Sequence, residues 1–256
     1  MAEGTPAIAL DDVSVRYRLA RERIPTFKEF AIKWLRGHVV YDELNALSHV
    51  NVRVRAGGSL GIIGRNGAGK TTMMKVIARV LRPTSGRVSV IGHVAPLLEL
   101  GAGFDMELSG RENVFLNGAL LGRSRKEMQR RLDQIVAFSQ LEHFIDAPLR
   151  TYSTGMVARL GFAIATDVRP DVLLLDEVLS VGDIEFQRKC MERIHAIRRD
   201  GATLVLVSHS PDAILQLCGD AVWLEEGRVI RQGPACGVVD AFVSSAAPRA
   251  PTMAAS

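Results

Sequence analysis

The alternation of apolar and polar residues along the chain distinguishes two kinds of strand. Residues 8–19 and 46–57 alternate apolar with polar side chains, as strands with one buried face do. Residues 59–64, 171–177 and 202–210 are short, almost continuous apolar runs, which are typical of strands buried on both faces of a parallel sheet. The pattern therefore predicts two half-buried strands and three fully buried ones.

Apolar residues at helical spacing fill the intervals between these strands. A helix is predicted directly after Gly69, and another begins at Ser124, where Glu127 completes a capping box. A third helix is predicted after residues 151–155, and a fourth covers residues 185–201, whose final glycine is a C-terminal stop. Strands that alternate with helices in this way predict an α/β fold with a parallel sheet.

Three segments depart from this alternation. Residues 104–168 contain no strand-like run and predict a helical subdomain, whereas residues 221–233 predict a hairpin that turns at Glu226 and Gly227. Residues 246–256 have little to pack and are expected to be a disordered tail. The expected organisation is one domain over residues 1–245, with its α/β core in residues 1–95 and 170–236.

Composition narrows the class of protein only modestly. With 256 residues and 47% apolar composition the chain can bury a sizeable core. A net charge of +4 suits nucleic acid or an anionic membrane but is too small to distinguish them. Cys190, Cys218 and Cys236 form no Cys-x-x-Cys pair and indicate reduced thiols in the cytosol. No run reaches the ~18 apolar residues of a membrane span, so we expect a protein in solution or on a membrane surface.

Residues 64–71, Gly-Arg-Asn-Gly-Ala-Gly-Lys-Thr, carry the strongest chemical motif. They fit the phosphate-loop pattern, and a predicted strand before them and a helix after them supply its usual context. Lys70 would place a charge at the β- and γ-phosphate oxygens, and Thr71 would offer a hydroxyl to Mg²⁺. The nucleotide-binding residues expected here are Gly64, Asn66, Gly67, Gly69, Lys70, Thr71 and Thr72.

Polar side chains end two of the buried strands. Asp176 is placed to hold Mg²⁺ through water, and Glu177 to orient and deprotonate an attacking water. An acidic pair at a strand end is often only surface, but a phosphate loop in the same parallel sheet favours the metal interpretation. His209 ends the strand of residues 202–210, and such strand ends converge on the ligand edge of the sheet. A lone histidine there is usually structural.

These motifs, in this order, resemble the nucleotide-binding subunit of an ATP-binding-cassette (ABC) transporter over nearly the whole chain. Residues 152–156, Tyr-Ser-Thr-Gly-Met, occupy the signature position, which is normally Leu-Ser-Gly-Gly-Gln. The resemblance implies a P-loop NTPase (RecA-like) core with a helical signature subdomain and a small antiparallel β part. It also implies a head-to-tail homodimer, in which Ser153 and Gly155 would bind the partner's ATP; Thr154 replaces the first glycine.

The resemblance assigns further roles. It implies that His209 is the family's switch histidine and that Ser180–Asp183 form the loop that crosses the dimer interface. Tyr17 best matches the aromatic that stacks on adenine, although an ordinary strand tyrosine is the alternative. Glu99 stands where the family usually has a glutamine that senses Mg²⁺.

The stretches of residues 97–104, 107–114, 152–156 and 176–183 resemble the ATPase subunits of bacterial polysaccharide exporters. Those systems move O-antigen, capsule, teichoic acid or related lipid-linked glycans across the inner membrane. The resemblance implies ATP and Mg²⁺ as cofactors, two integral-membrane permease subunits that handle the polysaccharide, and a peripheral position on the cytoplasmic face of the membrane, without nucleic acid. Another ABC transporter subunit, or a soluble ABC ATPase outside transport, is the alternative.

An inserted segment separates the first two predicted strands. Apolar residues in it recur at helical spacing over residues 26–36, and Thr26 with Glu29 could cap the helix. From Arg16 to Arg36 the chain has seven basic residues and two acidic ones. Aromatics on one face with surrounding cations describe a helix at a membrane interface, whereas a helix packed on its own core is the other interpretation. The apolar face consists of Phe27, Phe30, Ala31, Trp34 and Leu35.

Overall fold

Two sheets form the centre of the protein. The computed structural model describes residues 6–20, 41–97, 100–167, 169–176 and 182–246. A three-stranded antiparallel sheet has the order β2-β1-β4, and a six-stranded sheet has the order β5-β6-β7-β3-β8-β9, in which only the β8–β9 pair is antiparallel. The strands are β1 (Pro6–Ala20), β2 (Tyr41–Arg55), β3 (Ser59–Ile63), β4 (Ser85–Val90), β5 (Val94–Leu97), β6 (Val172–Asp176), β7 (Thr203–Val207), β8 (Asp220–Glu225) and β9 (Arg228–Pro234).

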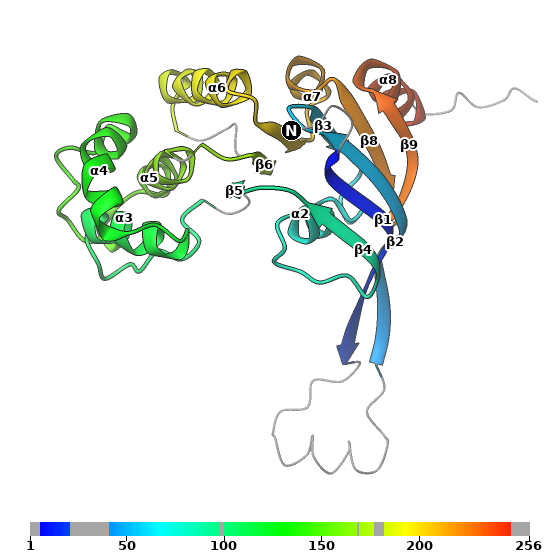
Figure 1. The fold of residues 1–256 in the computed structure, drawn as a ribbon, viewed down its shortest axis with the longest axis horizontal. Helices are drawn as coiled ribbons and strands as arrows, with labels where there is room; N and C mark the ends of the chain where they lie inside the picture. Colours follow the sequence, from blue (N-terminus) through cyan, green and yellow to red (C-terminus); the bar gives the residue numbers. More distant parts are fainter. Residues whose placement is uncertain (1–5, 21–40, 98–99, 168, 177–181, 247–256) are drawn as a thin grey trace, which may run out of the picture.

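The helices fall into three groups around these sheets. Figure 1 shows α2 against the strands, α3, α4 and α5 together in a separate helical lobe, and α6, α7 and α8 along the opposite side of the six-stranded sheet. The helices are α2 (Lys70–Ile77), α3 (Gly110–Leu120), α4 (Arg125–Ser139), α5 (Thr154–Thr166), α6 (Ile184–Arg199), α7 (Pro211–Leu217) and α8 (Ala235–Ala246), with a 3-10 turn at Leu149–Thr151.

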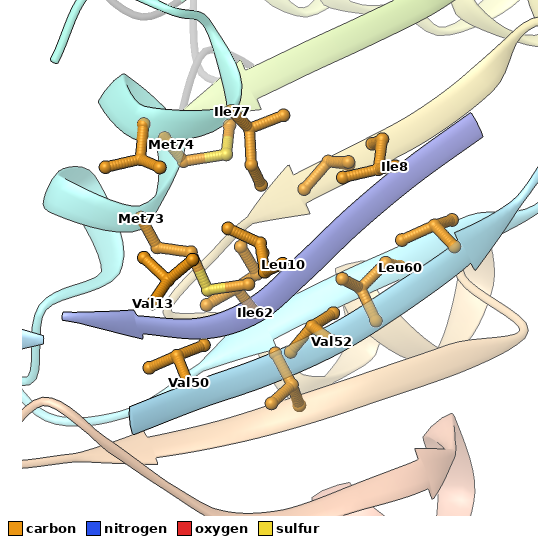
Figure 2. Packing of buried hydrophobic residues seen from close by; sticks show 14 of the residues in the cluster. Ile8, Leu10, Val13, Val50, Val52, Leu60, Ile62, Met73, Met74 and Ile77 are labelled. Atoms are coloured by element: carbon orange, nitrogen blue, oxygen red, sulfur yellow. The ribbon is translucent and has the colours of Figure 1, made fainter. Parts of the chain in front are cut away.

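The short helix α2 is held by an apolar cluster that it shares with both sheets. Met73 and Ile77 of α2, Leu10 of β1, Val52 of β2 and Ile62 of β3 all belong to this cluster (Figure 2). These five side chains are at most 3% exposed, and burying each contributes roughly 1.5–3 kcal/mol. The packing therefore fixes the start of α2, and the loop before it, relative to the sheets.

The helical lobe has its own core and well-defined helix starts. Ser124 and Glu127 form the predicted capping box at the start of α4. Met128 and Leu132, one and two turns into this helix, are buried. A second capping box begins α3: the Ser109 hydroxyl accepts from the Glu112 amide, and Glu112 accepts from the Ser109 amide. The hydrogen bonds that the Ser109 hydroxyl and amide donate to the Glu112 carboxylate lower its pKa, and those from the Ser124 amide and hydroxyl lower the pKa of Glu127.

Most of the predicted elements are confirmed. The three buried runs are β3, β6 and β7, and the predicted helices are α2, α4, α5 and α6. The hairpin turns at Glu226 and Gly227, where φ is 46° and 75°, as a two-residue turn with two left-handed residues requires. The sequence pattern did not predict α3, β4, β5, α7 or α8 as separate elements.

The two half-buried strands are longer than predicted. β1 and β2 pair along their full length, out to Ala20 with Tyr41, and the paired ends project as a ribbon beyond the rest of the sheet (Figure 1). The inserted helix predicted over residues 26–36 lies outside the described residues, as does the predicted tail apart from Ala246. Within the described ranges, every helix is too short or too polar to span a membrane.

The cysteines differ in accessibility. Cys190 and Cys218 are buried, and burial raises the pKa of each thiol to about 12, whereas Cys236 is exposed at the start of α8. Thiol reagents attack the thiolate, so a thiol with so high a pKa is almost unreactive near neutral pH.

We therefore expect a thiol reagent at pH 8 to modify one cysteine in the native protein and three after denaturation. Mass spectrometry of tryptic peptides identifies the labelled residue, and Cys236→Ser should abolish labelling of the native protein. Rapid native labelling of Cys190 or Cys218 would contradict the packing described here.

Candidate nucleotide site and signature helix

The glycine-rich loop connects β3 to α2 and requires its glycines for two different reasons. A Cβ at Gly64 would lie 2.2 Å from the backbone oxygen of Leu224, because β3 and β8 pack side by side here. Gly67 and Gly69 have φ of +79° and +102°, a region that side chains disfavour. Gly69 is also the N-cap residue of α2 and offers no side chain to the first amides of the helix. The loop therefore presents backbone N–H groups in the geometry that binds anions.

Lys70 lies inside the curve of this loop. Its side chain is buried, with 7% of the residue exposed, and its ammonium donates to the backbone oxygens of Gly64 at 2.8 Å and Arg65 at 3.1 Å. These carbonyls hold the charge at the centre of the loop, where it is available to a phosphate group that approaches the amides.

A cavity of about 420 Å³ opens beside the loop. A volume in this range is typical of small-molecule sites. Residues predicted from the sequence make up most of its lining, and Leu44, Asn45, Ala46, Ala68 and Val207 are the lining residues that were not predicted. The predicted residues in the lining are Tyr17, Asn66, Gly67, Gly69, Lys70, Thr71, Thr72, Asp176 and His209. Gly64 forms the base of the loop and does not itself line the cavity.

Tyr17 and Leu44 form one wall of the cavity. They lie opposite each other in the antiparallel pairing of β1 with β2, and Leu44 is 55% exposed. A tyrosine ring beside an exposed aliphatic side chain offers an apolar surface to a flat aromatic ligand. The sequence carries no signal for this pair, because it depends on the strand register.

Asp176 and His209 reach the cavity from neighbouring strand ends. Asp176 is the last residue of β6 and is paired in register with Val207, the last residue of β7; His209 follows two residues later. The six-stranded sheet thus brings both side chains to the same edge as the loop that follows β3.

The oxygen donors at this edge suit Mg²⁺. Thr71 supplies a hydroxyl and Asp176 a carboxylate, and Mg²⁺ prefers a few such oxygen ligands together with waters and substrate phosphates. Glu177 and Glu99, the other two carboxylates predicted to act here, lie outside the described residues. Among the residues that the structure describes, no group of three or more His, Cys, Asp and Glu side chains forms a metal cage.

The signature residues begin α5, in the helical lobe. Ser153 is the N-cap, and its hydroxyl accepts from the Met156 amide at 3.2 Å. Tyr152 anchors the preceding turn: its hydroxyl donates to the Phe144 backbone oxygen at 2.6 Å, and burial raises the pKa of this phenol. None of these residues lines the cavity beside the phosphate loop.

Gly155 differs from the other glycines of the helical lobe, each of which either has a positive φ or lacks room for a Cβ. A Cβ at Gly161 would lie 2.8 Å from the Gly101 amide, and one at Gly118 would lie 2.4 Å from Met128. At Gly155 the nearest atom would be the Ser153 oxygen at 3.8 Å, which is ordinary contact. Glycine in a helix costs up to about 1 kcal/mol relative to alanine. Packing among the residues that the structure describes therefore does not account for the glycine at position 155.

Comparison with known proteins identifies the family. The ABC transporter family model matches residues 47–180. The O-antigen export system ATP-binding protein RfbB of Myxococcus xanthus is 44% identical over 91% of this chain and 54% of its own length. The protein of the same name from Klebsiella pneumoniae is 45% identical over 77% of this chain and 80% of its own length.

A solved structure shares the fold. The dimeric post-hydrolysis structure of the ATP-binding cassette MJ0796 with ADP and Pi superposes with a TM-score of 0.71. The match covers 89% of this chain and 98% of that one, at 22% identity. The predicted fold class, a P-loop NTPase core with a helical signature subdomain, is confirmed. The chain belongs to the ABC transporter family.

Proposed function

We propose that this protein is the ATP-hydrolysing subunit of a system that exports a lipid-linked polysaccharide. The observation that carries the ATPase part is the cavity in which the phosphate loop, Asp176 and His209 meet. The polysaccharide part is supported by the relatives, which are named as ATP-binding proteins of O-antigen export. The substrate is therefore a cell-envelope glycan of the O-antigen, capsule or teichoic acid class.

The residues at the cavity have different roles in ATP binding and hydrolysis. Tyr17 and Leu44 would hold the adenine, the loop amides and Lys70 would bind the phosphates, and Thr71 with Asp176 would hold Mg²⁺. The bound ion would neutralise charge on the β- and γ-phosphate oxygens. Glu177, which follows Asp176 in the sequence, orients and deprotonates the attacking water, and His209 contacts the γ-phosphate. Glu99 is the remaining candidate for the metal shell.

A second copy of the chain completes each site. Ser153 and Gly155 lie at the start of α5, away from the cavity, with space over Gly155 that none of the described residues fills. In a head-to-tail homodimer these residues would bind the γ-phosphate of the ATP held by the partner, through the helix N-terminus and its amides. The open space at Gly155 supports this arrangement.

The dimer would act on integral-membrane permease subunits, two of them in a symmetric assembly, on the cytoplasmic face of the inner membrane. The permease subunits would handle the polysaccharide itself, and no nucleic acid takes part. The position of the inserted segment in the sequence supports contact with the membrane or permease. Residues 21–40 connect the paired ends of β1 and β2, which project from the core (Figure 1).

Replacing Glu177 by glutamine should separate ATP binding from hydrolysis. We expect Glu177→Gln to bind ATP normally, to accumulate as an ATP-bound dimer and to lose ~10²–10⁴-fold in turnover, since a general base typically contributes that much. Phosphate release and size-exclusion chromatography measure the two effects. Lys70→Ala is the contrasting variant and should lose ATP affinity itself. Near-normal hydrolysis by Glu177→Gln would remove Glu177 from this role.

Mixed dimers test whether the sites are shared between subunits. One subunit with Lys70→Ala paired with one carrying Ser153→Arg should keep one complete site and about half of the wild-type turnover. A subunit with both changes, paired with wild type, should lose both sites. ATPase assays on heterodimers purified with two affinity tags compare the pairings. If each chain worked alone, the first pairing would have no active site, whereas the second would keep the site of its wild-type subunit.

The inserted segment tests the export function. We expect Phe30→Ala combined with Trp34→Ala to leave the melting temperature and ATP affinity of the isolated subunit nearly unchanged. If these side chains were buried in its own core, each truncation would cost ~3–5 kcal/mol. Surface polysaccharide in cells should fall sharply, as should stimulation of the ATPase by the permease. A large loss of stability in the isolated subunit would show instead that this helix packs on its own core.

A further inference from the structure

The turn between β8 and β9 contacts two parts of the nucleotide site at once. The Gly227 amide donates to the backbone oxygen of Ala68 in the phosphate loop at 3.0 Å, and the Gly227 oxygen accepts from the Ser48 amide of β2 at 2.8 Å. Gly227 is buried, although Glu226, the other residue of the turn, is exposed. The turn therefore joins the loop that follows β3 to a strand of the other sheet.

The backbone of β2 approaches both the turn and the phosphate loop at Ala46. A Cβ at Gly227 would lie 2.7 Å from the Ala46 oxygen and 3.1 Å from the Leu47 Cα. A Cβ at Gly69, in the phosphate loop, would lie 2.4 Å from the same Ala46 oxygen. Real Cβ atoms do not come within 3.0 Å of a backbone atom. Here β2, the loop and the turn thus pack backbone against backbone.

Ala46 connects this contact to the wall that faces the base. Ala46 lines the nucleotide cavity and lies two residues along β2 from Leu44, which forms the apolar wall with Tyr17. The phosphate loop lines another part of the same cavity. The wall belongs to the antiparallel sheet, whereas the loop follows a strand of the six-stranded sheet. The distance between wall and loop therefore depends on how the two sheets are held together at Ala46.

We propose that Gly227 is a positioning residue for the nucleotide, because it fixes the spacing between the wall for the base and the loop for the phosphates. Gly227 does not itself line the cavity, so it acts through the two backbone segments that it holds. ATP spans wall and loop, and its affinity depends on reaching both at once. A ligand made of phosphates alone reaches only the loop. This inference rests on the proposed function, because it needs ATP as the ligand.

Replacing Gly227 by alanine tests the spacing. The new Cβ would collide with the Ala46 oxygen, and β2 is expected to move, because the packing of α2 also fixes the phosphate loop. We expect Gly227→Ala to raise the Kd for MgATP roughly tenfold and to leave the Kd for magnesium tripolyphosphate within about twofold. Isothermal titration calorimetry on the purified full chain measures both. A loss of affinity that the two ligands share, or no loss for MgATP, would overturn the proposal.

Two substitutions provide matched controls. Gly201 has φ of +96°, and a Cβ there would have no atom of the described residues within 4 Å. Gly201→Ala therefore introduces a strained alanine without a collision, at a position that does not line the nucleotide cavity. Glu226→Asn keeps a residue suited to its φ of 46° in the same turn as Gly227. Both variants should bind MgATP and magnesium tripolyphosphate as the wild type does, although Gly201→Ala should lower the melting temperature.

Gly227→Asn separates the collision from the backbone strain. Asparagine tolerates a positive φ better than alanine does, but it carries the same Cβ. We expect Gly227→Asn to lose as much affinity for MgATP as Gly227→Ala while it keeps a higher melting temperature. Wild-type affinity for MgATP in Gly227→Asn would show that strain in the turn, and not the spacing, weakens binding in the alanine variant, which would contradict the proposal.

Hydrogen exchange in the wild-type chain tests the contact without any substitution. The amides of Gly227 and Ser48 donate to the backbone oxygens of buried residues, so without nucleotide they should exchange as slowly as the amides of β3. Nuclear magnetic resonance resolves the single amides. Exchange more than about 100-fold faster than in β3 would show that the turn opens readily, and it would remove the proposal whether or not the variants fold.

The proposed function would fail in a different way. A wild-type chain that binds neither MgATP nor magnesium tripolyphosphate would remove the nucleotide site itself, and the role of Gly227 with it. A wild-type chain that binds both ligands, together with a Gly227→Ala variant that has no selective loss for MgATP, would leave the nucleotide site standing and remove only the positioning role.

Discussion

The parallel hydrogen bonding of β3, β6 and β7 is the constraint on which the nucleotide site depends. Val207 of β7 is in register with Asp176 on one side and with Ile62 of β3 on the other. The three strands therefore end at one level, and the loop after β3, Asp176 at the end of β6 and His209 after β7 line the same cavity. A shift of one residue in β6 would turn the Asp176 side chain to the opposite face of the sheet. The chemistry of the site is in this sense a consequence of strand register.

The central strands and the phosphate loop could be predicted because their signals are local. Strands buried on both faces must be largely apolar, and β3, β6 and β7 carry polar side chains only at their ends, which are Ser59, Asp176 and Thr203. The loop must contain glycine where φ is positive or where a neighbouring backbone approaches, as Gly69 and Gly64 do. Such requirements act on a few consecutive residues, so they leave a readable pattern. The capping box of Ser109 and Glu112 was equally readable, but sequence analysis does not single it out.

The wall formed by Tyr17 and Leu44 could not be predicted in the same way. Their pairing depends on how β1 aligns with β2 across an insertion, and several register shifts interrupt that alignment. Asp12 and His49 lie beside these shifts, and both have φ of 53°. A hydrogen bond of 2.8 Å joins His49 Nδ1 to Asp12 Oδ1. Alternation of apolar residues identifies a strand but not the residue it faces. The helix α8 was missed for a related reason, since its packing on Trp223 through Phe242 is a tertiary contact.

The signature helix contains a residue, Gly155, that neither the local sequence pattern nor the fold of one chain explains. Tyr152 and Ser153 have partners within the chain that account for them: a buried hydroxyl bond and a helix cap. Gly155 has no such partner in the described part of the chain, where an added Cβ would meet only the Ser153 oxygen at 3.8 Å. A residue that weakens its own helix and is not needed for packing indicates a close approach by something else. Under the proposed function that neighbour is the nucleotide held by a second copy of the protein, so half of each site is encoded in a segment that lies apart from the cavity.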